Sequence, residues 1–340
     1  MPSSINLKDG GCMDRRRALS SLLIFGVGSG ACPRSVWSAD IFPSRPVRII
    51  VTSSAGGVQD VNVRRVAERL ARSLGQPVVI DNRPGASGTI GTALGSKAPA
   101  DGYTITTGTS SALAVAPAVG QPLGFDPDND LQPITLGFLV PLVLLVNPAL
   151  RASNVQELIA MAKSRPGQLA YSVTGHAGTN HVAGEMFRHS ADIAVLHVPY
   201  KGDAEALVAV LGEEVQFTFG FPTSCLSQIR AGKLRALLVT AKRRLPALPN
   251  VPTSAEAGVS DLEIYAWAGF FVPRTTPAAV TARLNDEFVK VLHGAEFRAL
   301  AEQEGLIVGG DSPEEFRAFI AAERAKFSRI VRVTGIKRAE

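Results

Sequence analysis

The sequence predicts an α/β fold of two domains, each a mostly parallel sheet flanked by helices, joined by two crossover segments. Three observations lead to this prediction. The chain has 340 residues, which is enough for about two hydrophobic cores. Short apolar runs rich in β-branched residues alternate with segments of helical periodicity, as in parallel sheets, and this alternation starts again after residue 168.

Residues 1–39 predict an export signal that takes no part in the fold. Arg15, Arg16 and Arg17 precede the apolar run of residues 18–27, and small residues follow as far as Ala39. A positive segment, a short apolar segment and a small-residue end are typical of a secretory signal peptide, and the paired arginines also permit twin-arginine export. We therefore expect cleavage after Ala39 and a mature protein outside the cytoplasm, exported by the Sec or Tat route.

Charge and cysteine content change once this segment is set aside. Residues 1–39 hold five Lys and Arg and two Asp, so they carry +3 of the formal net charge of +5. The remaining +2 gives no reason to expect a nucleic-acid partner. Cys225 is then the one remaining cysteine, which excludes an internal disulfide and a cysteine-based metal site.

The first domain is predicted from residues 40–138, with residues 268–340 returning to it. Val63, Ala67, Leu70 and Leu74 fall on one helical face, and Gly75 ends that helix. The predicted strands are residues 47–51, 78–80 and 103–107, with helices after the first two.

The second domain is predicted from residues 139–267. Its predicted strands are residues 169–173, 193–198, 215–219 and 234–240, and its helices are residues 181–190, 203–211 and 223–231. The apolar segments 136–146 and 264–273 are interpreted as paired crossovers between the domains. In the C-terminal helical part, Thr276 is expected to cap a helix with Pro277 at its first position, and Ser312 with Glu315 forms a capping box for a last helix that runs toward Val333.

Four strand-to-helix loops are small, polar and glycine-rich: residues 52–60, 84–89, 108–111 and 174–180. Ligands of parallel sheets bind beyond the carboxyl ends of the strands, glycine allows backbone N–H groups to approach them, and helix N-termini add partial positive charge. The loops therefore predict a receptor for an anion, although tight turns alone remain an alternative for any one of them. The candidate binding residues from these loops are Ser53, Ser54, Ala55, Gly56, Gly57, Asp60, Ser87, Gly88, Thr109, Ser110, Thr174, Gly178 and Thr179.

Other kinds of site find little support, and we expect no catalytic residue, no metal and no cofactor. The loops do not match a nucleotide fingerprint or a P-loop, and no G-x-S-x-G elbow surrounds the serines. His176 and His181 form H-x4-H without a third ligand, so His181 is interpreted as a group that fixes the loop or donates to the ligand. Asp60 either caps a helix or contacts an amine or hydroxyl of the ligand. Trp267 is expected in the core, with the cleft wall as the alternative.

A resemblance covers residues 42–336. Its motifs include "FPSRPVRIIV" at 42–51, "VVIDNRPGASGTIG" at 78–91, "DGYTI" at 101–105, "FDPDNDLQPIT" at 125–135, "GTNHVAGEMF" at 178–187 and "HVPYKG" at 197–202. In this order they resemble the Bug family, the periplasmic solute-binding proteins of tripartite tricarboxylate transporters. The resemblance implies a two-domain fold like that of type II periplasmic binding proteins, which closes on a small carboxylate held largely by backbone amides and bridging waters.

Carried over to this chain, the family's pocket implies residues 53–57, residues 174–179 with His181, and the segment around Gly220 and Phe221. The chain departs from the family by having Thr52 and Ser53 where Pro-Phe is usual, and Gly220 where a polar or acidic residue is common. The expected protein is a periplasmic monomer that delivers an organic acid to the membrane permease subunits of such a transporter. A ligand-sensing subunit of a signalling receptor and, with less support, a serine hydrolase are the alternatives.

Overall fold

The computed structural model describes residues 42–174 and 178–336, all within the compact unit Asp40–Glu340. The expected export signal, residues 1–39, lies outside the described residues. Within the described ranges, no helix combines the length and the apolar character that crossing a membrane requires.

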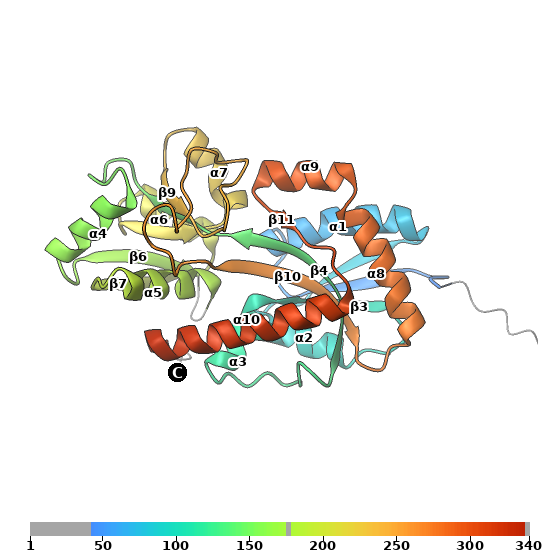
Figure 1. The fold of residues 1–340 in the computed structure, drawn as a ribbon. Coiled ribbons are helices and arrows are strands. Elements are labelled where there is room, and N and C mark those ends of the chain that lie inside the picture. The colour runs from blue at the N-terminus through green and yellow to red at the C-terminus, as the bar shows by residue number, and fades with distance from the viewer. Residues whose placement is uncertain (1–41, 175–177, 337–340) are drawn as a thin grey trace, which may run out of the picture. The chain divides into compact units, whose positions relative to one another are not determined.

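The first sheet has six strands in the order β11-β4-β10-β3-β1-β2 (Figure 1). Strand β1 pairs in parallel with β2 and β3, whereas β10 runs antiparallel to β3 and β4, and β11 runs antiparallel to β4. Its strands are β1 (Val47–Val51), β2 (Val78–Asn82), β3 (Thr104–Thr109), β4 (Leu131–Pro141), β10 (Tyr265–Pro273) and β11 (Ile307–Val308).

The second sheet has five strands in the order β7-β6-β8-β5-β9. Strand β6 pairs in parallel with β7 and β8, and β5 runs antiparallel to β8 and β9. Its strands are β5 (Val143–Val146), β6 (Leu169–Thr174), β7 (Val195–Tyr200), β8 (Phe217–Gly220) and β9 (Arg235–Val239). Each sheet thus combines parallel strands with antiparallel ones, so the sheets are mixed and not mostly parallel as predicted. The predicted alternation of strands and helices holds for the parallel part, and the antiparallel pairings come from the connecting segments β4, β5 and β10 and from β9 and β11.

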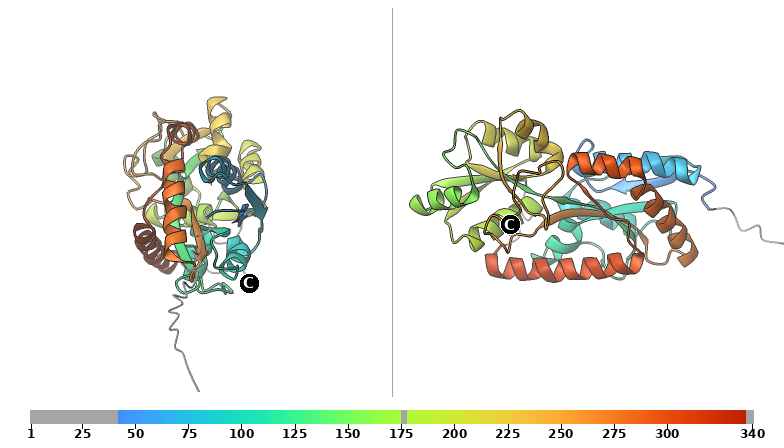
Figure 2. Two further views of the ribbon diagram at one scale, coloured as in Figure 1. Left: turned by 90° about the vertical axis from the view of Figure 1, so that its right-hand side faces the viewer. Right: turned by 45° about the horizontal axis from the view of Figure 1, so that its top comes forward.

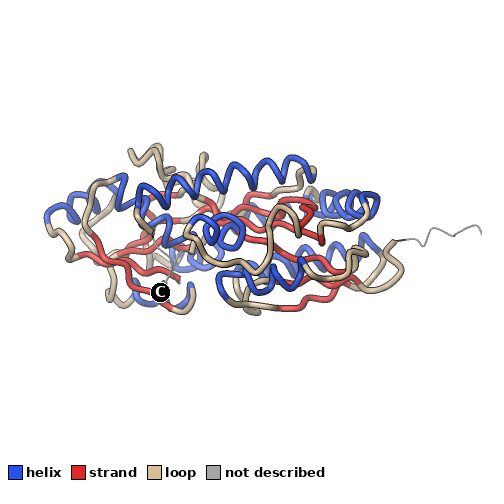
Figure 3. The backbone as a smooth tube through the Cα atoms, turned by 90° about the horizontal axis from the view of Figure 1, so that it is seen from below, coloured by secondary structure: helices blue, strands red, loops and turns tan. Residues whose placement is uncertain are grey.

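Helices cover both faces of each sheet, with the strands in the interior (Figure 3). On the first sheet, α1 packs with α8 on one face, and α2, η2 and α10 lie on the other. These helices are α1 (Val58–Leu74), η1 (Ala86–Gly88), α2 (Thr89–Ser96), the π-helical turn η2 (Ser111–Val115), α3 (Ala116–Ala118), α8 (Ala278–Leu292), α9 (Ala295–Glu304) and α10 (Pro313–Thr334).

The second sheet is covered by helices on both faces, because alternate side chains along its strands point to opposite faces and pack against different helices. In β5, Leu144 and Val146 enter the core that contains α4 and α5, and Val143 and Leu145 enter the core that contains α6 and α7. All four side chains are fully buried, so the strand is apolar on both faces. The helices are α4 (Val155–Ser164), α5 (Thr179–Ser190), α6 (Asp203–Leu211) and α7 (Pro222–Arg230).

Two extended segments connect the sheets, as predicted for the apolar crossovers. Strand β4 pairs antiparallel with β10 from Leu131 opposite Pro273 to Pro141 opposite Tyr265, and the chain then passes through Leu142 into β5. The change of sheet therefore falls at Leu142 on the outgoing segment, and the first sheet receives the returning chain from Tyr265.

Helix α10 lies along both halves of the molecule (Figure 2). It packs on β4 and η2 of the first half and on α5 of the second. The indole N–H of Trp267 donates to Glu323 at 3.0 Å, and Arg188 on α5 donates to the carbonyl of Thr334 at 3.3 Å. The capping box predicted from Ser312 and Glu315 is present at its start.

Other element predictions have mixed outcomes. Gly75 ends α1 in a left-handed conformation, with φ 66°, as expected. The prediction for Thr276 was wrong, because α8 begins at Ala278 with Pro277 as its N-cap, and the Thr276 hydroxyl has no hydrogen-bond partner among the described residues. Helices α4 and α9 and the turn η2 were not predicted.

Candidate functional site

A cavity of about 630 Å³ lies beyond the carboxyl ends of the parallel strands of both sheets. The loops after β1, β2 and β3 form one side, and the loops after β6 and β7 form the other, as expected for a ligand site in a parallel sheet. Its wall contains Thr52, Ser53, Ser54, Gly57, Val58, Gln59, Pro84, Gly85, Ser87, Gly88, Thr109, Ser110, Ser111, Phe138, Val140, Thr174, Gly178, Thr179, Asn180, Tyr200, Lys201, Gly202, Asp203, Phe221, Ala266, Trp267 and Ala268.

Four helices begin at glycines in this wall. Gly57, Gly88, Gly178 and Gly202 are the N-caps of α1, α2, α5 and α6, and all four line the cavity. Glycine has no side chain that could occupy the amide groups of the first turn, so no N-cap side chain competes with a ligand for them. The Thr89 amide of α2 already donates to the Ala86 carbonyl, and the first turns of α1 and α6 contain Asp60 and Asp203. An anion is the ligand that such an arrangement stabilises.

The first glycine loop is fixed by Asp60, which lies in the first turn of α1. Its buried carboxylate accepts hydrogen bonds from the Gly56 amide at 2.9 Å, from Arg64 at 2.9 Å and from Asn82 at 2.8 Å. Burial alone would raise the pKa of Asp60, but these donors hold it below its ordinary value. Asn82 also donates to the carbonyl of Ser53 at 3.0 Å, so the loop is held at both ends.

Only one of the two glycines in this loop requires glycine on backbone grounds. Gly56 has φ +79°, a conformation that L side chains rarely adopt. Gly57 has φ −71°, and a Cβ there would approach the carbonyl oxygen of Ser54 at 3.2 Å. Gly56 therefore makes the turn, and Gly57 lines the cavity.

The second glycine loop holds its backbone in an unfavourable conformation at the cavity wall. Gly85, Ala86, Ser87 and Gly88 have successive positive φ values of 127°, 47°, 57° and 93°. Left-handed conformations of alanine and serine cost of order 1 kcal/mol or more each and occur preferentially at ligand sites. Their presence here supports a binding role for this wall.

Ser53 lines the cavity and carries an unsatisfied hydroxyl. Its oxygen is buried, and among the described residues it has no hydrogen-bond partner. A buried hydroxyl without a partner is costly, and a bound ligand would satisfy it. The neighbouring side chains of the wall, by contrast, have hydrogen-bond partners within the protein, because Gln59 donates to Thr107 at 2.8 Å and to Thr52 at 3.2 Å.

The two halves contact each other across the cavity. The hydroxyls of Ser110, after β3, and Thr179, on α5, lie 3.1 Å apart, and the Ser110 hydroxyl also accepts from the backbone N–H of Trp267 at 3.4 Å. Trp267 is 2% exposed and lines the cavity, so it serves both in the core and in the wall. The described residues of the wall include no histidine that could serve Ser53 or Ser110 as a base.

Two charged side chains are found among the described residues of the cavity wall, and both were missed as site residues. They are Lys201 and Asp203, on the loop from β7 into α6. The segment was predicted as a loop followed by a helix, but its amino-acid sequence does not indicate that it faces the other half of the molecule. The register of β7 beside β6 places it there.

The predicted site residues divide by position. Those that line the cavity are Ser53, Ser54, Gly57, Ser87, Gly88, Thr109, Ser110, Thr174, Gly178, Thr179 and Phe221. Ala55 and Gly56 belong to the first loop but not to the wall. Asp60 neither caps α1, whose N-cap is Gly57, nor reaches the cavity. Gly220 ends β8 in the core, where a Cβ would come within 2.8 Å of Leu145.

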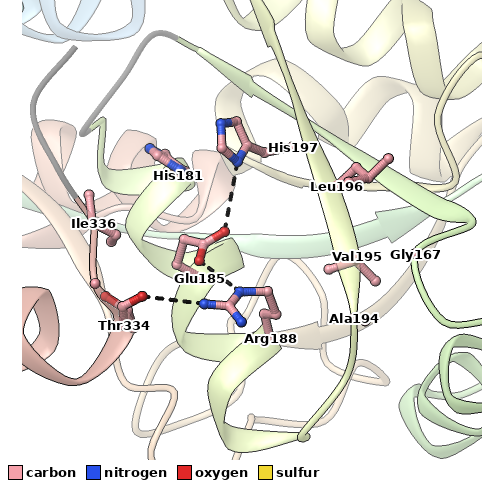
Figure 4. A pocket seen from close by; sticks show the side chains of 11 residues that line it. Gly167, His181, Glu185, Arg188, Ala194, Val195, Leu196, His197, Thr334 and Ile336 are labelled. Atoms are coloured by element: carbon pink, nitrogen blue, oxygen red, sulfur yellow. Dashed lines mark hydrogen bonds and ion pairs between the residues drawn. The ribbon is translucent and has the colours of Figure 1, made fainter. Parts of the chain in front are cut away.

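His181 lines a different cavity, of about 580 Å³, between α5 and β7 (Figure 4). Figure 4 shows Glu185 between Arg188 and His197, and the arginine donates to the glutamate at 2.8 Å. Tyr171 donates to the same carboxylate at 2.7 Å, and the His197 ring nitrogen lies 3.9 Å from it. The network ties β6, α5 and β7 together.

His181, Glu185 and His197 also form a group that could hold a metal ion, with ligand atoms all within 4.8 Å of one another. Both carboxylate oxygens of Glu185 already accept hydrogen bonds, however, and the Arg188 guanidinium would repel a divalent cation. His176, the other member of the H-x4-H pattern, lies outside the described residues.

Two lobes of α/β structure, two connecting strands and a cavity between the strand ends define a solute-binding protein of the periplasmic-binding-protein type. The sequence matches the family described as the tripartite tricarboxylate transporter family receptor, TctC, over residues 62–336. The chain belongs to this family, whose members include the Bug proteins. It is a solute-binding receptor and not an enzyme, as predicted.

Similar proteins agree with this assignment. The chain is 37% identical to Protein BugT of Bordetella pertussis, with 96% of this chain and 99% of that protein covered. The structure resembles R. palustris Rpa4515 with adipate, with a TM-score of 0.82, 34% identity and coverage of 88% and 100%. It also resembles MatC from Rhodopseudomonas palustris with bound malate, with a TM-score of 0.76, 27% identity and coverage of 85% and 100%. The predicted two-domain fold is confirmed.

Proposed function

We propose that this protein captures a small carboxylate in the cavity between its lobes and delivers it to the permease of a tripartite tricarboxylate transporter. The observation that carries the proposal is the convergence of four glycine-capped helix N-termini on one cavity. The buried and unpartnered Ser53 hydroxyl adds a hydrogen-bond donor. The adipate and malate bound to similar proteins support the same class of ligand.

The binding residues in this proposal are the predicted ones that line the cavity, together with Gln59, Lys201 and Asp203. The protein works as an exported monomer in the periplasm, with residues 1–39 as its signal. Residues 40–138 with 268–340 form one lobe, and residues 139–267 form the other. The lobes close around the acid by hinge motion about the two connecting segments.

A thermal-shift screen of mono-, di- and tricarboxylates, amino acids and aromatic acids tests the capture step. Ligand at about one hundred times its dissociation constant stabilises the folded state by about 2.7 kcal/mol, which raises the melting temperature measurably. Calorimetry should then give one site per chain, with the acid unchanged after incubation. If no acid in the screen shifts the melting temperature of the folded protein, the proposal is wrong.

A further inference from the structure

We propose that Asp203 selects for an acid that also carries a protonated amino group, so that the ligand of this site is an aminocarboxylate. This inference rests on the proposed function, because it takes the cavity as a carboxylate site. It concerns one side chain that the loop pattern did not identify.

Asp203 is the acidic side chain among the described residues of the cavity wall. It is the first residue of α6, directly after the N-cap Gly202, and it is half-buried. Among the described residues, none donates a hydrogen bond to its carboxylate or lies in ion-pair range of it, and burial is the one cause of its shifted titration. The cavity wall therefore presents a carboxylate that no described residue pairs with.

The electrostatic state of this carboxyl restricts the ligand. Burial raises the pKa of Asp203 to about 6, so the group is ionised at neutral pH. An ionised carboxylate that lacks a partner repels a second carboxylate and attracts an ammonium group. The buried thiol of Cys225, whose pKa burial raises to about 12, supplies no compensating charge.

The cavity has a separate place for the acidic end of the ligand. Gly88 on the first lobe and Gly178 on the second begin α2 and α5, and neither helix has an acidic residue in its first turn. The first turn of α1 contains Asp60, which pairs with Arg64, and Asp203 itself offsets the positive end of α6. The wall is thus favourable to an anion beside Gly88 and Gly178 and to a cation beside Asp203.

Lys201 is the basic side chain among the described residues of the wall, and it lies two residues before Asp203. It is exposed. In the described part of the structure, Lys201 and Asp203 form no ion pair, because their charged atoms are more than 4.0 Å apart. The lysine therefore does not satisfy Asp203. A ligand ammonium placed between the lobes would do so.

Matched pairs of acids that differ only in an amino group test the inference. Alanine and propionate, 4-aminobutyrate and butyrate, and glutamate and glutarate are titrated into the wild-type protein and into Asp203→Asn by calorimetry at pH 7.5. In wild-type protein we expect the amino member of at least one pair to bind at least tenfold more tightly than its partner. In Asp203→Asn that preference should fall at least tenfold, because the neutral amide no longer attracts the ammonium.

Asp261→Asn is the control, because Asp261 is an exposed carboxylate outside the cavity wall, and it should leave both affinities unchanged. Circular dichroism checks that Asp203→Asn folds. If the acids without an amino group bind best in wild-type protein, or if Asp203→Asn keeps the preference, the role of Asp203 is overturned while carboxylate capture stands. If neither member of any pair, nor any acid of the wider screen, binds, the proposed function itself fails.

Discussion

Asp60 shows how one side chain positions the binding loop without touching the cavity. Its carboxylate accepts three hydrogen bonds, from Gly56, Arg64 and Asn82. Replacement by asparagine turns one acceptor into a donor that faces other donors. Because unsatisfied buried groups cost about 1–3 kcal/mol, we expect Asp60→Asn to lower the free energy of unfolding by about that amount at pH 7 and to weaken ligand binding.

The effect of Asp60 should depend on pH. Its pKa is lower in the folded than in the unfolded chain, so its contribution to stability is complete well above the ordinary aspartate pKa of 3.8 and is lost as the pH falls through the folded pKa. The difference between wild type and Asp60→Asn in urea unfolding should therefore shrink between pH 6 and pH 2.5. Asp286→Asn, at an exposed position, should show no such trend. A difference that stays constant over this range would contradict the assignment.

The sequence alone located much of the cavity wall at the residue scale, because glycine and small polar residues after strands have a direct physical meaning. It could not distinguish Gly57, which faces the cavity, from Gly56, which makes the turn. Asp203 and Lys201 were missed because a charged residue at a helix start is ordinarily solvated. The packing of the two lobes against each other places Lys201 and Asp203 in the cavity wall, and this packing cannot be derived from the local sequence.

Helix α10 depends on its first turn at the scale of the element. The hydroxyl of Ser312 accepts from the Glu315 amide at 3.2 Å, and the Glu315 carboxylate accepts from the Ser312 amide at 2.9 Å. We expect Ser312→Ala to lower the free energy of unfolding by about 1 kcal/mol, because loss of an N-cap typically costs that much. Urea denaturation measures it, with the exposed Ser260→Ala as the matched control. An unchanged midpoint would mean that the helix end contributes nothing.

Element prediction succeeded where local chemistry decides the outcome. The capping box of α10 and Gly75 at the end of α1 are local signals, and both are confirmed. Thr276 failed because Pro277 occupies the N-cap itself, and a threonine before it cannot reach the first turn of α8. The turn η2, residues 111–115, follows a strand without a helix-start signal, and its burial among α2, α10 and β3 stabilises it instead.

The contact between Ser110 and Thr179 concerns the whole molecule, because it joins the two lobes across the cavity. In a Ser110→Cys, Thr179→Cys variant, sulfurs replace two oxygens that lie 3.1 Å apart, so we expect a disulfide to form between them. Oxidation should hold the lobes together and slow ligand association at least tenfold, and dithiothreitol should restore it. The native Cys225 is buried, which keeps it from competing.

The same variant in its reduced form is the reference, since it carries both substitutions without the crosslink. Stopped-flow binding of the best acid from the screen gives the association rate. If the oxidised protein binds as fast as the reduced one, the ligand does not enter by separation of the lobes at this point, and the hinge motion proposed above is wrong.

For the whole molecule, the sequence predicted the two-lobed α/β fold because the alternation of strands and helices begins twice and the apolar connecting segments can be recognised. The contacts of the last helix, α10, could not be predicted in this way. Its capping residues announce a helix, but they do not show that the same helix packs on β4 and on α5.

That packing makes α10 a brace across the hinge. The helix is held to the first sheet by the hydrogen bond between Glu323 and Trp267 and to α5 by the hydrogen bond between Thr334 and Arg188, so the hinge motion proposed above requires one of these contacts to change. Ligand capture would then alter the contacts of a helix that contributes no described residue to the cavity wall.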